Sequence, residues 1–399
     1  MTDPRRVGRL DGVRALAALS VVCFHVWLYR FDRPRGERTE LLDQVLFHAS
    51  TGLICFFVLS GFLLYGAFAR AALTGSEGVA LVPYLRRRAA RIVPAYWVCG
   101  AVSLVLFALV GYDAITPAAH ELPLFALFLQ NYSLSTMGDL NPVTWTLCVE
   151  VAFYALLPLV GWLALRLGPG RVRAQVLLVV GLIAIAPAWS VVGLELGWGG
   201  LAERALPAYL GAFGIGMLVA VWMQWRRADG RLGAPLGART TGVLLAAAVV
   251  IVVGDAAVSE HGWWLRDGIF GHHALRPSVQ IELVGHLGAS AGFALLITAA
   301  ACGSGPAVGW LGWRPVAALG VVSYGMYLWH LPLLLTLREA GLLPGALLPR
   351  LLVVASVTAL VAAASWRWVE RPWIERGRRA GRREGGAIAR RGAAAEPAS

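Results

Sequence analysis

The chain contains many apolar stretches, and each is long enough to cross a lipid bilayer as a helix. This feature restricts the possible architecture of the chain. A membrane-spanning helix needs about 20 consecutive apolar residues. Hydrophobic residues make up 58% of the 399 residues, whereas a soluble globular domain contains about 45–50%. The sequence predicts an all-α polytopic membrane protein with about ten transmembrane helices, at 13–29, 49–69, 94–110, 143–165, 175–193, 206–224, 241–258, 282–302, 316–337 and 348–368.

The basic residues lie between these stretches and set the expected orientation. The net charge of +12 comes from arginine alone, because the chain contains no lysine. Alternate connecting segments are rich in arginine, so the positive-inside rule places them, and both termini, in the cytoplasm. This clustering indicates contact with membrane lipid and excludes a nucleic-acid-binding face. The composition, rich in arginine, alanine and glycine, indicates a high-GC bacterium and hence a multi-pass protein of the plasma (inner) membrane.

We expect one membrane-embedded domain over residues 1–374, followed by an Arg-rich cytoplasmic tail over 375–399 that is disordered near anionic lipid heads. The connecting segments 111–142 and 259–281 are unusually long. The first contains the apolar stretch 122–129, which is too short to span and predicts a re-entrant or interfacial piece. Both segments could shape an acceptor site or serve as plain connectors.

An ionisable pair lies in the first apolar stretch. Arg14 and His25 are close to three helical turns apart, so they share one helix face and are separated by about 16 Å along the axis. A neutral imidazole can act as a general base toward a hydroxyl or as a nucleophile toward a thioester. Arg14 can bind an anion, and Asp11 can pair with Arg14. Alternatively, Arg14 is a snorkelling anchor and His25 bonds a neighbouring helix.

A second candidate is the arginine run directly before the third span. Arg88 and Arg91, at positions i and i+3, lie on one face of any helix formed there. Two guanidinium groups side by side form a good phosphate clamp, because each presents a planar fork of donors. The alternative is a membrane anchor of the positive-inside type.

The third candidate opens the fourth span. Glu150 lies about 10 Å into this helix, and Tyr154 follows at i+4 on the same face. A carboxylate at that depth must be neutralised, paired or exposed to a wet cavity. Because His25 reaches a comparable depth, Glu150 could orient or activate it, or bind an acceptor hydroxyl, with Trp145 and Tyr154 as substrate contacts. The alternative is a buried, protonated glutamic acid bonded to a neighbouring helix.

A last set lies in the ninth span. Ser323, Tyr327 and His330 share one helix face at steps of four and three. His330 is expected near the outer end of the span, where solvation at the interface explains its presence. The spacing alone therefore predicts no catalytic role for it.

The chain contains six short motifs, which are Leu10–Ala17 with His25, Phe56–Phe62, Arg88-x-x-Arg91-Ile92-x-Pro94, Trp145–Glu150 with Phe153, Tyr154 and Pro158, Ser323–His330, and Glu370-Arg371-Pro372. Taken in this order, they resemble the motifs of acyltransferase family 3, a family of integral membrane O-acyltransferases. The resemblance implies transfer of an acyl group, commonly acetyl, from acyl-CoA to a hydroxyl of a carbohydrate or related acceptor. It also implies that Arg14 and His25 are the essential pair, Arg88 and Arg91 a second arginine motif, and Glu150 the acidic residue.

Two positions depart from the family pattern. Thr146 replaces the more usual serine and keeps the hydroxyl. Ile54 stands where many members have an acid before the paired phenylalanines, so any role of that acid is absent here.

The expected layout places acyl-CoA (acetyl-CoA as the expected donor) on the cytoplasmic side, with its phosphates on Arg88, Arg91 and Arg14, and brings the thioester to His25. A carbohydrate or glycosylated acceptor enters from the outer half. The alternative function is a transporter or flippase of a polar or glycan-type solute, because intramembrane His, Arg and Glu also line transport pathways. No metal is expected, since the five cysteines lie in apolar surroundings without C-x-x-C spacing. The sequence identifies neither the acceptor nor the oligomeric state.

Overall fold

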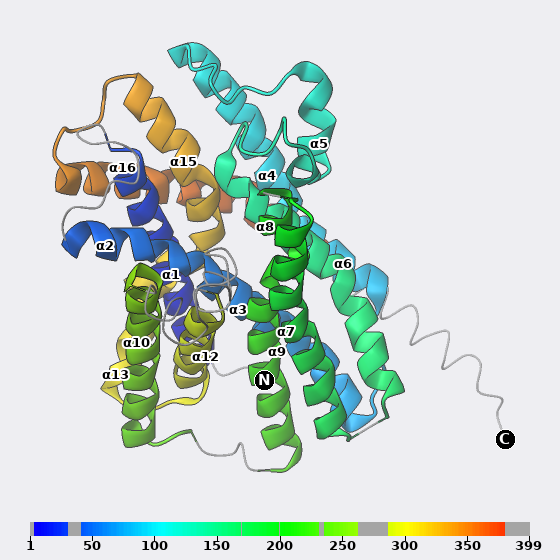
Figure 1. Cartoon of the computed structure of the whole chain (residues 1–399). Helices are drawn as coiled ribbons and strands as arrows, with labels where there is room; N and C mark the ends of the chain where they lie inside the picture. The colour runs from blue at the N-terminus through cyan, green and yellow to red at the C-terminus, as the bar shows by residue number, and fades with distance from the viewer. Residues whose placement is uncertain are drawn as a thin grey trace.

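All of the regular structure that can be described is helical (Figure 1). The computed structural model describes residues 4–30, 41–168, 170–198, 200–230, 235–261 and 286–379. Within these ranges there is no β-strand. Helices suit a bilayer because each one satisfies its backbone hydrogen bonds internally.

Eight candidate spans are long and apolar enough to cross a membrane, and two bent helix pairs raise the number to ten if each pair counts as one span. The prediction of an all-α protein with about ten transmembrane helices is confirmed. Which side of the membrane the termini face stays a prediction. The eight spans contain α1 (Pro4–Leu28), α3 (Gly52–Thr74), α4 (Leu81–Val110), α6 (Trp145–Arg166), α7 (Val172–Glu195), α9 (Leu206–Ala228), α10 (Ala238–His261) and α16 (Leu347–Ser365).

The two bent pairs depart from straight helices. The helix α12 (Leu287–Cys302) meets the segment Pro306–Gly312 at 101°. Gly305, in this break, has a φ of 91°, a conformation that favours glycine. The helices α14 (Arg314–Val321) and α15 (Ser323–Glu339) meet at 68°. The stretch expected as one span over 316–337 is therefore two helices that meet at an angle.

Short elements join the long helices. In the connector 111–142, the Tyr96 hydroxyl on α4 donates to the Phe125 carbonyl oxygen at 2.9 Å, so the connector folds back against α4. Its apolar stretch forms only one short helix, and its interfacial placement stays a prediction. Most of 259–281 lies outside the described residues. The short elements are α2 (Leu41–His48), η1 (Ala49–Thr51), η2 (Ala119–Glu121), α5 (Leu122–Ala126), η3 (Gln130–Tyr132), η4 (Pro142–Thr144), α8 (Gly200–Glu203), α13 (Pro306–Gly309), η7 (Trp310–Gly312) and η8 (Trp366–Glu370).

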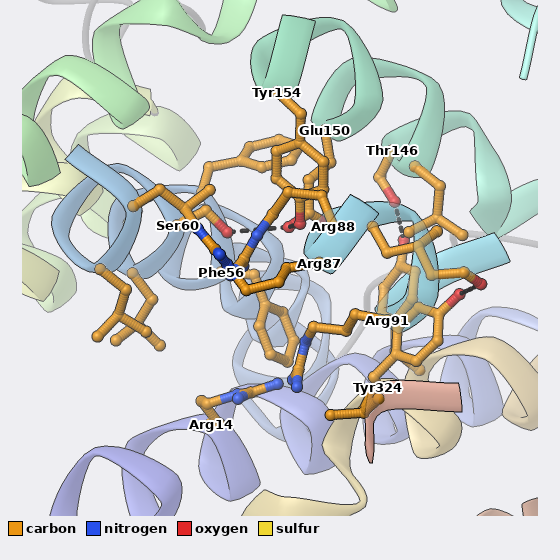
Figure 2. A pocket seen from close by; sticks show the side chains of 18 of the residues that line it. Arg14, Phe56, Ser60, Arg87, Arg88, Arg91, Thr146, Glu150, Tyr154 and Tyr324 are labelled. Atoms are coloured by element: carbon orange, nitrogen blue, oxygen red, sulfur yellow. Dashed lines mark hydrogen bonds between the residues drawn. The ribbon is translucent and has the colours of Figure 1, made fainter. Parts of the chain in front are cut away.

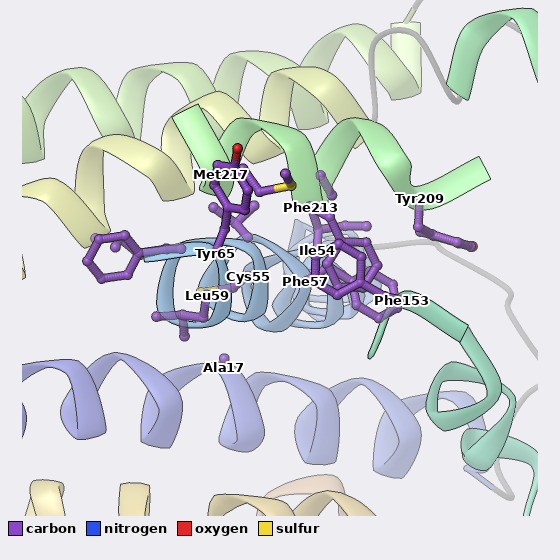
Figure 3. Close-up of a cluster of buried hydrophobic side chains, with 14 of the residues drawn as sticks. Ala17, Ile54, Cys55, Phe57, Leu59, Tyr65, Phe153, Tyr209, Phe213 and Met217 are labelled. Carbon is purple, nitrogen blue, oxygen red and sulfur yellow. The ribbon is translucent and has the colours of Figure 1, made fainter. Parts of the chain in front are cut away.

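The core forms where α3 packs against α9. Figure 3 shows α3 lying between α1 and α9. A Cβ atom at Gly61 would overlap the backbone of Phe213, and one at Gly216 would overlap the backbone of Val58. Small residues allow such close approach of membrane helices, which is a main source of their packing energy. The ring of Phe213 also stacks on Phe153 of α6, with centroids 3.9 Å apart.

The C-terminal helix runs further than the expected membrane domain. After α16 it continues through η8 as far as Arg379. The boundary at 374 stays a prediction, as does the disorder of the tail, because residues 380–399 lie outside the described part of the chain.

Candidate active site

A cavity of about 400 Å³ opens among α1, α3, α4, α6 and α15, and we call it the arginine cavity. Arg14 comes from α1, Arg87, Arg88 and Arg91 from α4, and Arg378 from the C-terminal helix. The only acidic residue in the described lining is Glu150. Five guanidinium groups facing one carboxyl group make this cavity a site for an anionic ligand.

The guanidinium groups are arranged around this space. In Figure 2, those of Arg14 and Arg91 point toward one another, although they come from different helices. The Arg88 Cζ atom lies 5.9 Å from the centre of the Tyr154 ring, and its Nε is buried without a hydrogen-bond partner. Like charges that face each other are stabilised by an anion between them. The arrangement therefore fits a phosphate-bearing ligand.

Glu150 belongs to this cavity and not to the site of His25. The Ser60 hydroxyl donates to its Oε1 at 3.1 Å, and the Tyr154 hydroxyl donates to the same oxygen at 2.5 Å (Figure 2). Tyr154 lies one turn after Glu150 on α6, which brings its ring back over the carboxyl group. These bonds hold Glu150 among the arginines.

His25 lines a second cavity, of about 280 Å³, which we call the histidine cavity. Trp145 and Arg204 also line it. The end of α1 next to His25 is held in place by a buried ion pair, in which Arg30 Nη1 lies 2.6 Å from Asp43 Oδ1. A buried pair with this short distance fixes the direction in which α1 ends.

The imidazole of His25 is paired with that of His330. His330 Nε2 lies 3.1 Å from His25 Nδ1, and His330 is fully buried. His330 Nδ1 lies 2.6 Å from the Tyr327 carbonyl oxygen, and His25 Nδ1 lies 2.9 Å from the Val21 carbonyl oxygen. A carbonyl oxygen only accepts, so in the neutral rings both Nδ1 atoms carry the proton.

This assignment has a direct consequence for His25. Its Nδ1–H is shared between the Val21 carbonyl oxygen and the lone pair on Nε2 of His330. Nε2 of His25 is then unprotonated, and no described residue bonds to it. An unprotonated ring nitrogen in a cavity is the form of histidine that takes a proton or attacks a carbonyl carbon.

The two cavities share two lining residues. Leu53 and Tyr327 line both of them. The Tyr327 hydroxyl donates to the Val143 carbonyl oxygen at 2.8 Å and lies 2.7 Å from Thr146 Oγ1. These two bonds fix the position of the Tyr327 hydroxyl. Because Leu53 and Tyr327 line both cavities, the cavities adjoin at these residues.

The structure brings together only part of the predicted site. Arg14, Arg88 and Arg91 meet in one cavity, and Trp145 lies with His25 in the other. Tyr154 lines the arginine cavity, and within the described residues Glu150 and His25 share no cavity.

Asp11 and His330 depart most from expectation. Among the described residues, Asp11 lies beyond ion-pair distance of Arg14, although the two charges interact electrostatically. His330, which the spacing placed near an interface, is instead the buried partner of His25. The sequence showed only that His330 and Tyr327 share a helix face, and it gave no signal that His330 contacts His25. In the described ranges, no three His, Cys, Asp or Glu side chains are grouped to hold a metal ion.

Sequence comparisons identify relatives of this chain among known proteins. The chain is 24% identical over 386 residues to YrhL of Bacillus subtilis strain 168, provisionally named a peptidoglycan O-acetyltransferase; the match covers 92% of this chain and 55% of YrhL. It is 28% identical over 365 residues to the exopolysaccharide production protein ExoZ of Rhizobium meliloti strain 1021, covering 84% of this chain and 96% of ExoZ.

A third relative is the O-acetyltransferase OatA of Staphylococcus aureus, 22% identical over 391 residues, with 94% of this chain and 58% of OatA covered. The chain thus spans little more than half the length of YrhL and OatA. No solved structure matches it significantly. The profile of acyltransferase family 3, described as an acyltransferase domain, matches residues 7–367. Because this match covers most of the sequence, the chain belongs to acyltransferase family 3.

Proposed function

We propose that this protein is a multi-pass O-acyltransferase of the bacterial plasma membrane. It moves an acyl group, acetyl in the simplest case, from acyl-CoA in the arginine cavity to a hydroxyl of a carbohydrate in the histidine cavity. The observation that carries the proposal is the adjacency of these two cavities at Leu53 and Tyr327. Relatives named for peptidoglycan O-acetylation and exopolysaccharide production support a glycan acceptor.

The positive charge of the arginine cavity supports its assignment as the site of the acyl donor. Coenzyme A carries a 3′-phosphate and a diphosphate, and the arginine cavity offers five guanidinium groups as partners. The pantetheine arm is long and thin, so it can cover the roughly 16 Å along α1 that separates Arg14 from His25. In this layout the phosphates stay on the arginines while the thioester reaches toward His25 across the boundary that the two cavities share at Leu53 and Tyr327.

The chemistry is assigned to Nε2 of His25. It takes the proton of the acceptor hydroxyl as the hydroxyl oxygen attacks the thioester carbonyl carbon. The C–O bond forms, the C–S bond breaks, and the proton passes from His25 to the departing thiolate, giving the ester and free coenzyme A. A covalent route would use the same nitrogen as the nucleophile. Trapping an acylated enzyme without acceptor would select the covalent route, and ternary-complex kinetics the direct one.

His330 is a positioning residue in this scheme, because it touches His25 and not the substrates. We expect His330→Leu to lower kcat about 10- to 100-fold with both KM values unchanged, since it removes one of the two acceptors that orient Nδ1–H of His25 and leaves only the Val21 carbonyl oxygen. His330→Gln places an amide oxygen near the same position and should keep most of kcat. Steady-state kinetics of both variants check this. Wild-type kcat in His330→Leu would contradict it.

The enzyme is distinguished from a transporter or flippase by the covalent product. Purified protein is given acetyl-CoA labelled in the acetyl group, together with fragments of the host's surface glycan. The proposal predicts label in the glycan that mild alkali releases as acetate, because the product is an ester. Passage of glycan across vesicles without acetyl transfer would favour the transporter.

A further inference from the structure

Arg204 enters the histidine cavity from the turn between α8 and α9. Its Cζ atom lies 5.9 Å from the centre of the Trp145 ring. The buried amide of Asn131 donates to the carbonyl oxygens of both residues, at 2.9 Å for Arg204 and 2.7 Å for Trp145. Arg204 and Trp145 are therefore fixed beside one another in the wall that faces the acceptor.

The guanidinium of Arg204 is incompletely satisfied. Its Nη1 is buried and makes no hydrogen bond within the described residues. Leaving a buried charged donor without an acceptor is unfavourable. No aspartate or glutamate occurs among the described residues that line this cavity. The buried Nη1 of Arg204 therefore lacks an anionic acceptor among these lining residues.

A second arginine in the same protein shows the completed arrangement. Arg30 also lies over a tryptophan, with its Cζ 5.3 Å from the centre of the Trp27 ring. Asp43, however, supplies a carboxylate oxygen 2.6 Å from Arg30 Nη1. The pair of Arg204 and Trp145 reproduces this arrangement without the carboxylate, and it does so inside a cavity.

We propose that Arg204 binds an anionic group, a carboxylate or a phosphate, on the acceptor, and that Trp145 packs against the sugar that carries it. The preferred acceptor is then an acidic saccharide. This rests on the proposed function, because it assumes that the acceptor occupies the histidine cavity. A cavity of about 280 Å³ is near the lower limit for small-molecule sites, so a sugar that reaches His25 also reaches Arg204.

The test compares three disaccharides that share one skeleton: cellobiose, cellobiouronic acid and cellobiose 6′-phosphate. Isothermal titration with the purified protein gives the Kd of each, without any need for acyl transfer. We expect at least one acidic probe to bind about tenfold to a hundredfold more tightly than cellobiose, as expected for a charge-assisted bond. The comparison of the two acids identifies which anion the site prefers.

The variant Arg204→Gln should bind all three probes with the affinity of cellobiose. The matched control is Arg226→Gln, because Arg226 also lies over a tryptophan, Trp222 at 5.3 Å, but at the far end of α9 and outside both cavities. This control should keep the wild-type preference. Equal binding of the three probes by the wild type, or a preference that survives Arg204→Gln, overturns the proposal.

Kinetics separate this role from a catalytic one. If Arg204 binds the acceptor, Arg204→Gln raises the KM for the acidic acceptor and leaves the KM for acetyl-CoA unchanged. An equal loss of kcat with neutral and acidic acceptors would place Arg204 at the reacting atoms and contradict the proposal. A preference for acidic probes without any ester formation would support the anion site and refute the proposed acyltransferase function.

Discussion

Replacing His25 by glutamine is expected to lower kcat for acyl transfer about a thousandfold or more. Glutamine is similar in length but cannot take a proton from a hydroxyl at neutral pH, and general-base catalysis contributes about 10²- to 10⁴-fold. The KM for acyl-CoA should stay near the wild-type value, since the donor's phosphates are held in the arginine cavity, which His25 does not line. Steady-state kinetics with both substrates varied measure the two effects separately.

A control shows whether the lower kcat of His25→Gln comes from lost catalysis or from misfolding. His120→Gln is the matched control, because His120 is exposed in η2 and lines neither cavity. Its kcat should equal that of the wild type. Both variants should elute as the wild type does on size exclusion and unfold at a similar temperature. Full transfer activity in a folded His25→Gln protein would contradict the assignment of Nε2 as the base.

The double variant Arg88→Gln/Arg91→Gln is expected to raise the KM for acyl-CoA about a hundredfold or more. A hydrogen bond between charged partners is worth about 1.5–3 kcal/mol, and two such arginines act on the donor's phosphates. The KM for the acceptor should not change, because neither arginine lines the histidine cavity. The measurement is the donor KM at low and moderate salt, and the variant should lose most of the salt dependence.

A truncated acyl donor tests whether Arg88 and Arg91 act on the phosphates of acyl-CoA. Acetyl-pantetheine keeps the thioester but lacks the nucleotide and its phosphates, so its KM should be high and equal in the wild type and the double variant. The control Arg226→Gln/Arg227→Gln removes the same charge from the end of α9, outside the arginine cavity. It should leave the KM for acyl-CoA unchanged. A double variant with unaltered donor KM would return Arg88 and Arg91 to the role of membrane anchors.

The spans could be predicted because length and hydropathy are local properties. A stretch of about 20 apolar residues has few alternatives in a protein of this composition. The 68° bend between α14 and α15 could not be predicted from the sequence, because the residues around Val322 carry no proline and continue an apolar pattern. Its angle depends on neighbouring helices, which the pattern of one segment does not reveal.

For the site residues too, relations within one helix could be predicted from spacing, whereas contacts between helices could not. Arg88 and Arg91 share a helix face by spacing alone, and they meet in one cavity. Depth along a span suggested that Glu150 could reach His25, but depth leaves the direction of each side chain undetermined. In the structure Glu150 turns toward Ser60 and Tyr154.

The partner of His25 shows this limit most clearly. His330 and His25 are 305 residues apart in sequence, and only the packing of α15 against α1 brings their rings together. Spacing within one helix could show that His330 and Tyr327 share a face. It could not show which helix that face contacts.

We propose that the acyl donor and the acceptor occupy adjoining cavities that are reached from opposite sides of the membrane. The most direct measurement reconstitutes the protein in sealed vesicles with an acidic oligosaccharide trapped inside and labelled acetyl-CoA added outside. We expect labelled ester to accumulate inside while intact acetyl-CoA stays outside, and we expect vesicles with the His25→Gln variant to form no ester. Ester that forms only when both substrates are on the same side would contradict it.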